Sequence, residues 1–111
     1  MVFIPEVIAH RIMARFAVTV RFSANFNEDF LALIPQHRAI INPLIEEHVV
    51  EAYAISVNGT RGGITMNGQN AAVIRAVVEQ FPLFRFFEQV AVAELFVFDS
   101  MAARFPRSSL H

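Results

Sequence analysis

Four segments of the chain have the character of β-strands, with apolar and polar residues alternating in 15–22 and 51–58, and two segments between the four repeat apolar residues every three or four positions. A two-residue period is typical of a half-buried β-strand, and a period near 3.6 is typical of an amphipathic helix. The order strand–helix–strand–strand–helix–strand constrains the fold more than any other feature. The predicted strands are 15–22, 51–58, 61–67 and 89–98, and the predicted helices are 27–49 and 71–81.

The first predicted helix begins at Asn27, a plausible N-cap that precedes two acidic residues. Pro35 and Pro43 interrupt its interior, and we expect one bent helix rather than two. Its apolar stripe also carries two histidines, His37 and His48. The apolar members of the stripe are Phe30, Ile34, Ile41, Leu44 and Ile45.

A tight turn is predicted between the second and third strands, because Asn58-Gly59 readily adopts positive φ values. Gly62 and Gly63 follow in the returning strand and indicate a bulge or a close approach of backbone. The second helix ends before Pro82. The stretch after Pro82 is predicted to be a loop.

This order of elements predicts a ferredoxin-like α+β fold, in which a four-stranded antiparallel sheet carries both helices on one face. With 111 residues the chain provides one domain. We place this domain at 14–99, with an N-terminal extension at 1–13 and a C-terminal tail at 100–111.

The last predicted strand is apolar on both faces, and only Glu94 interrupts it. Two helices cover one side of a sheet, so the other side would expose a broad apolar surface. We therefore expect a homodimer that packs this surface against a second copy. The alternative is a central last strand that the N-terminal extension covers.

Composition excludes several classes of protein. The formal net charge is −1, so nothing favours nucleic acid as a partner, and cysteine is absent, which removes thiolate chemistry and zinc–thiolate sites. His37 and His48 are three helical turns apart and too distant to share a metal ion, so we expect no metal site. Neither a secretory signal nor an apolar run of about 20 residues is visible, which predicts a cytoplasmic protein with no membrane partner.

The segment from Met13 to Asp99 resembles the muconolactone isomerase-like group of the dimeric α+β barrel superfamily. The resemblance rests on three stretches: 44–47 (LIEE), 53–56 (YAIS) and above all 81–84 (FPLF). It implies a pocket without a cofactor, between sheet and helices, for small and often anionic cyclic or aromatic compounds. The Trp-Arg and Asn-Tyr pairs of those isomerases are missing here, so no catalytic residue is carried over.

His37 is the candidate catalytic residue, because an imidazole on the stripe that faces the sheet could transfer a proton to or from a ligand. The alternative is a core histidine that is hydrogen-bonded to a buried partner. Tyr53 and Ser56 lie on opposite faces of their strand, so at most one of them lines a given pocket. The candidate substrate-binding residues are Arg38, Tyr53, Ser56, Arg61 and Glu94.

Two functions remain open. The first is a small-molecule-binding protein that takes a small organic acid, aromatic or lactone-like, and isomerises it by proton transfer at His37 while an arginine holds the carboxylate. The second is a non-catalytic dimeric structural or interaction module whose interior is filled by its own side chains. A cavity of several hundred Å³ beside His37 would favour the first, and a packed interior the second.

Overall fold

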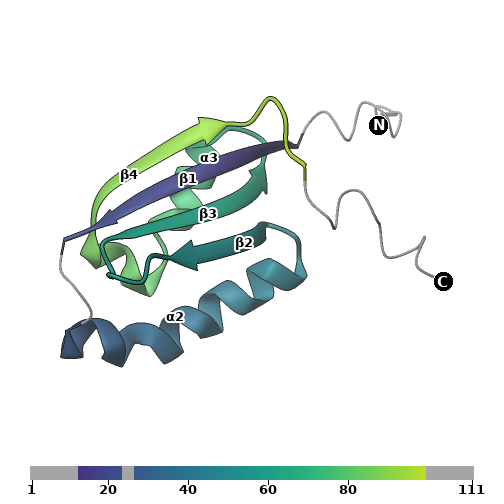
Figure 1. Cartoon of the computed structure of the whole chain (residues 1–111). Helices are drawn as coiled ribbons and strands as arrows, with labels where there is room; N and C mark the ends of the chain where they lie inside the picture. The colour runs from purple at the N-terminus through teal and green to yellow at the C-terminus, as the bar shows by residue number, and fades with distance from the viewer. Residues whose placement is uncertain (1–12, 24–26, 100–111) are drawn as a thin grey trace.

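The computed structural model describes residues 13–23 and 27–99 (Figure 1). Most of the predicted N-terminal extension and the whole predicted tail lie outside these residues, so the domain boundaries stay predictions. The elements in chain order are β1 (Ala14–Phe22), α2 (Glu28–Glu46), β2 (Val50–Ile55), β3 (Arg61–Gly68), α3 (Ala71–Val78), the 3₁₀ helix η1 (Pro82–Phe86) and β4 (Phe87–Glu94).

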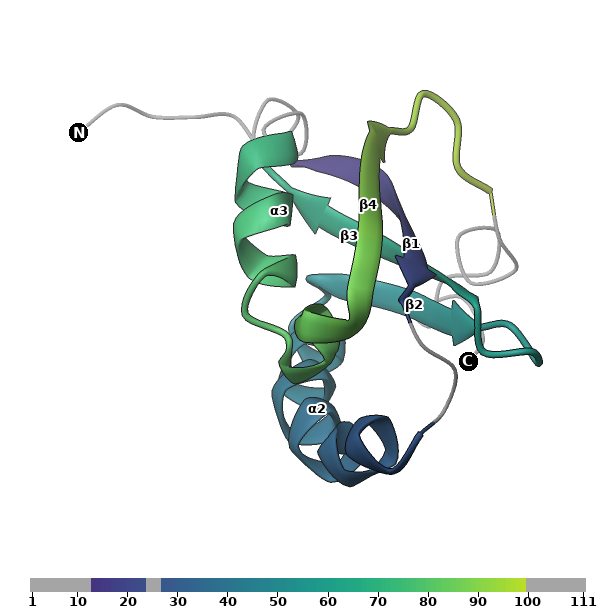
Figure 2. The same ribbon diagram turned by 90° about the vertical axis from the view of Figure 1, so that its left-hand side faces the viewer.

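The four strands form one antiparallel sheet in the order β2-β3-β1-β4. Both α-helices lie on the same side of this sheet, which Figure 2 shows from the side of β4. The predicted ferredoxin-like α+β fold is therefore confirmed. Since β4 is an edge strand, the alternative of a central last strand is wrong.

Helix α2 begins where the sequence predicts, because the Asn27 side chain accepts a hydrogen bond from the amide of Phe30 at 2.8 Å. Both prolines lie inside this one helix. The helix ends at Glu46, earlier than expected, and His48 beyond it has a φ of 63°. His48 is exposed, so the prediction that it continues the buried stripe is wrong.

Helix α3 is also shorter than predicted. The Asn70 side chain caps it by accepting from the amide of Val73 at 2.9 Å, and the helix ends at Val78 instead of Phe81. The predicted loop after Pro82 is the 3₁₀ helix η1, with Leu83 and Phe86 buried.

The core lies between the sheet and the helices. The predicted inner face of β1 is confirmed, since its aromatic and β-branched residues are all buried there. The buried apolar residues are Phe16, Val18, Val20, Phe22, Phe30, Ile41, Val50, Ile64, Met66, Ile74, Val78, Phe81, Leu83 and Phe86.

Two strand ends differ from the prediction. Strand β2 ends at Ile55, which leaves Val57 fully exposed in the turn. Strand β4 ends at Glu94 instead of residue 98, and its last register partner is Phe16 of β1. After Glu94, the amide of Leu95 still donates to the Arg15 carbonyl at 2.8 Å.

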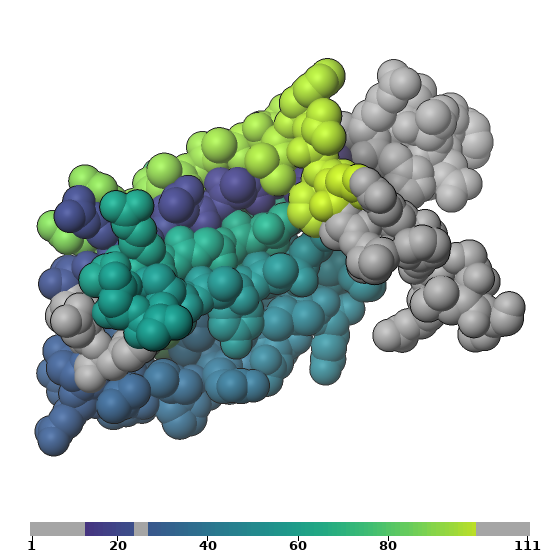
Figure 3. Space-filling view, viewed as in Figure 1, coloured from purple at the N-terminus to yellow at the C-terminus, as the bar shows by residue number. Residues whose placement is uncertain are grey.

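The sheet face without helices, here called the open face, differs most from its prediction (Figure 3). Its two middle rows carry small side chains, so the expected broad apolar surface is absent there. The bulkier Val90 and Val92 of β4 pack instead toward the core. The middle rows are Ala52-Thr65-Ala17-Ala93 and Ala54-Gly63-Thr19-Ala91.

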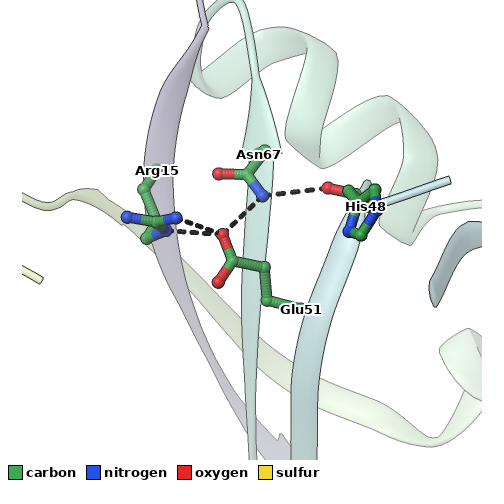
Figure 4. A network of polar contacts seen from close by, with 4 residues as sticks. All are labelled: Arg15, His48, Glu51 and Asn67. Carbon is green, nitrogen blue, oxygen red and sulfur yellow. Dashed lines mark hydrogen bonds and ion pairs between the residues drawn. The ribbon is translucent and has the colours of Figure 1, made fainter. Parts of the chain in front are cut away.

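A polar network closes one end of the open face (Figure 4). Arg15 of β1 forms an ion pair with Glu51 of β2, and the same carboxylate oxygen accepts from Asn67 of β3 at 2.7 Å. Asn67 also donates to the His48 carbonyl at 2.9 Å. The Arg15 guanidinium lies 4.1 Å from the ring centroid of Phe98, so this network joins three strands and the segment after β4.

Candidate functional site

A cleft opens between α2, the β2–β3 hairpin and the segment around η1. It encloses about 330 Å³ when the open mouth is included, but its interior has room for only about one water molecule. The cleft is almost wholly apolar. Its lining residues are Val20, Phe22, His37, Ile41, Tyr53, Ala54, Ile55, Gly62, Gly63, Ile64, Leu83 and Phe87.

His37 is the buried polar residue in the wall of this cleft. Only 8% of the residue is exposed, and its buried Nδ1 atom has no hydrogen-bond partner among the described residues. Its ring packs edge-on against Phe81, with the ring centroids 5.4 Å apart. The core histidine with a hydrogen-bonded partner, which was the alternative from the sequence, is therefore not what the structure contains.

Burial lowers the pKa of His37 below its ordinary value of 6.5. An apolar environment disfavours the imidazolium ion, and no carboxylate lies beside the ring among the described residues to compensate. The imidazole is thus neutral at pH 7. A neutral imidazole can accept a proton, hydrogen-bond a hydroxyl group or polarise a carbonyl.

Tyr53 lies in the same cleft and places a second polar group near its mouth. The residue is 36% exposed and pairs with Ile64 of β3, on the core side of the sheet. Ser56 is opposite Arg61 and belongs to the open face, so the expectation that at most one of Tyr53 and Ser56 lines a pocket agrees with this geometry.

Close backbone approach shapes the inner wall of the cleft. A Cβ atom on Gly62 would lie 3.3 Å from both the Ala54 carbonyl oxygen and the Phe22 ring, whereas one on Gly63 would meet nothing within 4 Å. The predicted close approach therefore holds for Gly62. No register shift occurs at Gly62 or Gly63; the register shifts in β2 between Val50 and Ala52, and opposite Arg21 and Phe22 in β4.

The other predicted site residues lie outside the cleft. Arg38 is exposed on α2, and Glu94 is exposed at the end of β4, so Glu94 does not need the buried partner that its apolar neighbours suggested. The Ser56 hydroxyl orders the hairpin turn by donating to Asn58 at 2.7 Å and accepting from the amide of Arg61 at 3.1 Å. Arg61 itself is exposed on the open face.

Two features of the structure were not identified from the sequence, one at the cleft and one on the open face. Phe81 was assigned only to a helix stripe, yet its ring supports His37. Arg21 was assigned to the polar face of its strand, yet it lies directly opposite Arg61. The alternation in the first strand indicated that Arg21 lies on the polar face, but only the strand register shows that it lies opposite Arg61.

The described part of the chain offers neither a metal cluster nor a membrane-spanning helix. Residues 13–23 and 27–99 contain no group of three or more histidine, aspartate or glutamate side chains that could hold a metal ion. Within the same residues, no helix combines the length and apolarity that crossing a bilayer requires.

Comparisons with known proteins extend the description of the fold. No protein-family model matches the chain, and no curated protein matches its sequence. Among solved structures, it is similar to 5-chloro-2-hydroxyhydroquinone dehydrochlorinase from Burkholderia phenoliruptrix AC1100, in complex with 2,5-dihydroxybenzoquinone. That match has a TM-score of 0.63 and 13% identity, and covers 73% of this chain and 92% of the other.

Two further solved structures match the chain with lower TM-scores. The protein PH0061 has a TM-score of 0.50 at 10% identity over 90% of this chain and 62% of its own. Hydroxynitrile lyase from Passiflora edulis has a TM-score of 0.45 at 12% identity over 80% of this chain and 96% of its own. At 13% identity, the likeness to the dehydrochlorinase shows the fold alone.

Proposed function

We propose that this protein binds a small cyclic compound in the cleft beside His37 and moves a proton on it without a cofactor, as a muconolactone isomerase-like protein would. The observation that carries the proposal is the Nδ1 atom of His37, which is buried and has no hydrogen-bond partner. An unpaired buried polar atom costs stability. A ligand that hydrogen-bonds this imidazole would remove that cost.

Proton transfer fits the state of the ring. Burial keeps His37 neutral at pH 7, so it can act as the base that removes a proton next to a carbonyl group. The apolar wall excludes water and strengthens polar interactions with a bound ligand. Tyr53 can donate a hydrogen bond from the mouth to the oxygen on which negative charge develops.

The cleft has to widen to admit a ring, since it holds about one water in its present form. Tyr53 and Ile55 are the mouth residues free to move, with 36% and 39% of their surfaces exposed. No arginine lines the cleft. If the ligand is an acid, its carboxylate therefore points out through the mouth toward solvent, where Arg38 on α2 is exposed.

The proposal takes support from the chemistry of the similar dehydrochlorinase. The ligand in that complex is 2,5-dihydroxybenzoquinone, a flat ring with hydroxyl and carbonyl groups. Compounds of this class, together with lactones and small aromatic acids, are the ligands that we propose for the cleft.

The narrow interior favours one alternative function. A cleft that its own Phe22, Leu83 and Phe87 nearly fill is what a non-catalytic structural or interaction module would have. In the ligand-binding protein, the side chains of Tyr53 and Ile55 move aside to admit a ligand. In the non-catalytic module they do not.

We further propose that two copies associate through the open face. The middle rows expose alanine, glycine and threonine, so a second sheet could approach closely. Beside these rows, Phe96 and Val97 are 101% and 72% exposed in the segment after β4. Burying such apolar side chains against a second copy would stabilise a dimer.

The test is a screen of lactones, hydroxyquinones and aromatic acids for proton-transfer isomerisation by the full chain. The variants are H37N and, as a matched control, H48N. His48 is exposed at a φ of 63°, where asparagine is well tolerated. We expect H37N to reduce turnover by about 10²- to 10⁴-fold and H48N to retain it. Equal turnover by wild type and H37N would contradict the proposed role of His37, and failure of every compound to bind would favour the structural module.

A further inference from the structure

The end of the open face opposite the Arg15–Glu51 network carries two arginines side by side. Arg21 of β1 and Arg61 of β3 are register partners in the antiparallel ladder. The neighbouring hydrogen bond, from the amide of Phe22 to the Thr60 carbonyl at 2.9 Å, makes Arg21 and Arg61 a non-hydrogen-bonded pair. In such pairs the Cα atoms are only about 4.5 Å apart, and the side chains lie close together.

Both guanidinium groups project away from the core. Arg21 alternates with the buried Val20 and Phe22, and Arg61 precedes Gly62, whose core side contacts the Phe22 ring. Both arginines are exposed. They form the end row of the open face, next to the β2–β3 turn, so they stay at its rim even if a second copy covers the middle rows.

Neither arginine has an acidic partner among the residues that the structure describes. The carboxylate on the open face, Glu51, is held by Arg15 at the opposite end. Glu88, the extra residue at the bulge of β4, makes no ion pair with Arg21 or Arg61. Gln89, the register partner of Arg21 on β4, adds an exposed amide donor to the same row.

We propose that this row, Gln89-Arg21-Arg61, is a binding site for the carboxylate of a small organic acid. Like charges directly opposite each other repel, and a carboxylate between two guanidinium groups would replace the repulsion with charge-assisted hydrogen bonds. The site is on the opposite side of the sheet from His37 and is independent of the cleft.

The test titrates the full chain with sodium benzoate and, separately, with inorganic phosphate at constant ionic strength. The arginine Nε–H signals are followed by NMR. We expect benzoate to shift the signals of Arg21 and Arg61 along one saturable curve. R21Q and R61Q should each weaken binding at least about tenfold, because each removes charge-assisted hydrogen bonds. R85Q, which removes an exposed arginine outside the row, should not.

Other outcomes would overturn the proposal. Unsaturable shifts of all arginines would indicate nonspecific ion binding, and saturation by phosphate but not benzoate would indicate a different ligand class. If benzoate has no effect and R21Q weakens self-association in sedimentation, a carboxylate of a second copy occupies the pair instead. H37N should leave benzoate binding at this row unchanged, so failure here is distinguishable from failure of the cleft proposal. Thermal melts of each variant verify that it is folded.

Discussion

The ring of His37 meets the ring of Phe81 edge-on, with the planes at 83° and the centroids 5.4 Å apart. Within residues 13–23 and 27–99, the buried Nδ1 atom of this histidine has no hydrogen-bond partner. The same surroundings that position the imidazole therefore keep it neutral and available.

Acid should destabilise the protein through His37. Its folded-state pKa is lowered by burial, so below the unfolded value of 6.5 the unfolded chain binds more protons than the folded one. The contribution of His37 to the free energy of unfolding is complete above pH 6.5. It is lost as the pH falls from 6.5 to the pKa of His37 in the folded protein. The slope is at most about 1.4 kcal/mol per pH unit.

Urea unfolding of wild type, H37N and H48N between pH 4 and 8 measures this effect. The free energy of unfolding of wild type relative to that of H37N should decrease as the pH falls. The free energy of unfolding of H48N should change with pH as that of wild type does. Parallel curves for wild type and H37N would mean that the pKa of His37 is not lowered by folding.

Alanine substitutions at the neighbouring glycines Gly62 and Gly63 test how closely the cleft wall is packed. G62A places a methyl group 3.3 Å from the Ala54 carbonyl oxygen and from the buried Phe22 ring, and we expect a loss of about 1 kcal/mol or more. G63A enters open space and should be neutral or stabilise by about 0.5 kcal/mol, because alanine loses less backbone entropy than glycine. Thermal unfolding compares the two variants, and equal stabilities would contradict the tight approach at Gly62.

The Arg15–Glu51–Asn67 network should stabilise the sheet. E51A removes the acceptor for Arg15 and for Asn67, and we expect a cost of about 1 kcal/mol, limited by the partial exposure of the ion pair. E88A removes an exposed carboxylate without such contacts and serves as the control. Denaturant midpoints that change equally in both variants would show that the network contributes nothing specific.

The arginine pair should cost stability in the absence of a ligand. R21E would place opposite charges across the β1–β3 ladder in place of like charges, and we expect a gain of about 0.2–1 kcal/mol at low salt. The gain should shrink as salt is added. A loss of stability, or a gain that salt does not alter, would argue against close packing of Arg21 and Arg61.

The fold could be predicted from the sequence because its periodic segments are long and because capping and turn residues lie at their ends. Asn27 and Asn70 cap the helices, and the turn after Asn58 places Gly59 at a φ of 70°. The last strand was overextended because the apolar pattern continues past Glu94, whereas the pairing with β1 ends at the Phe16–Glu94 pair. Periodicity reports which residues could be buried and not whether a neighbouring strand is present.

The site was predicted only in part. A histidine on a helical stripe was visible in the sequence, but its missing hydrogen-bond partner depends on every element packed around it. Arg38, Ser56, Arg61 and Glu94 were also candidates, but none of them lines the cleft. Arg38 is exposed on α2, Ser56 and Arg61 belong to the open face, and Glu94 is exposed at the end of β4. The Arg21–Arg61 pair required the register, which pairs residues 40 positions apart.

The most direct test of the central claim follows the proton itself. A carbonyl compound that binds the cleft is incubated in D₂O with wild type, H37N or H48N, and exchange of its acidic C–H is followed by ¹H NMR. If His37 is the base, wild type and H48N should catalyse exchange and H37N should be slower by at least about 100-fold. Undiminished exchange by H37N would contradict the account.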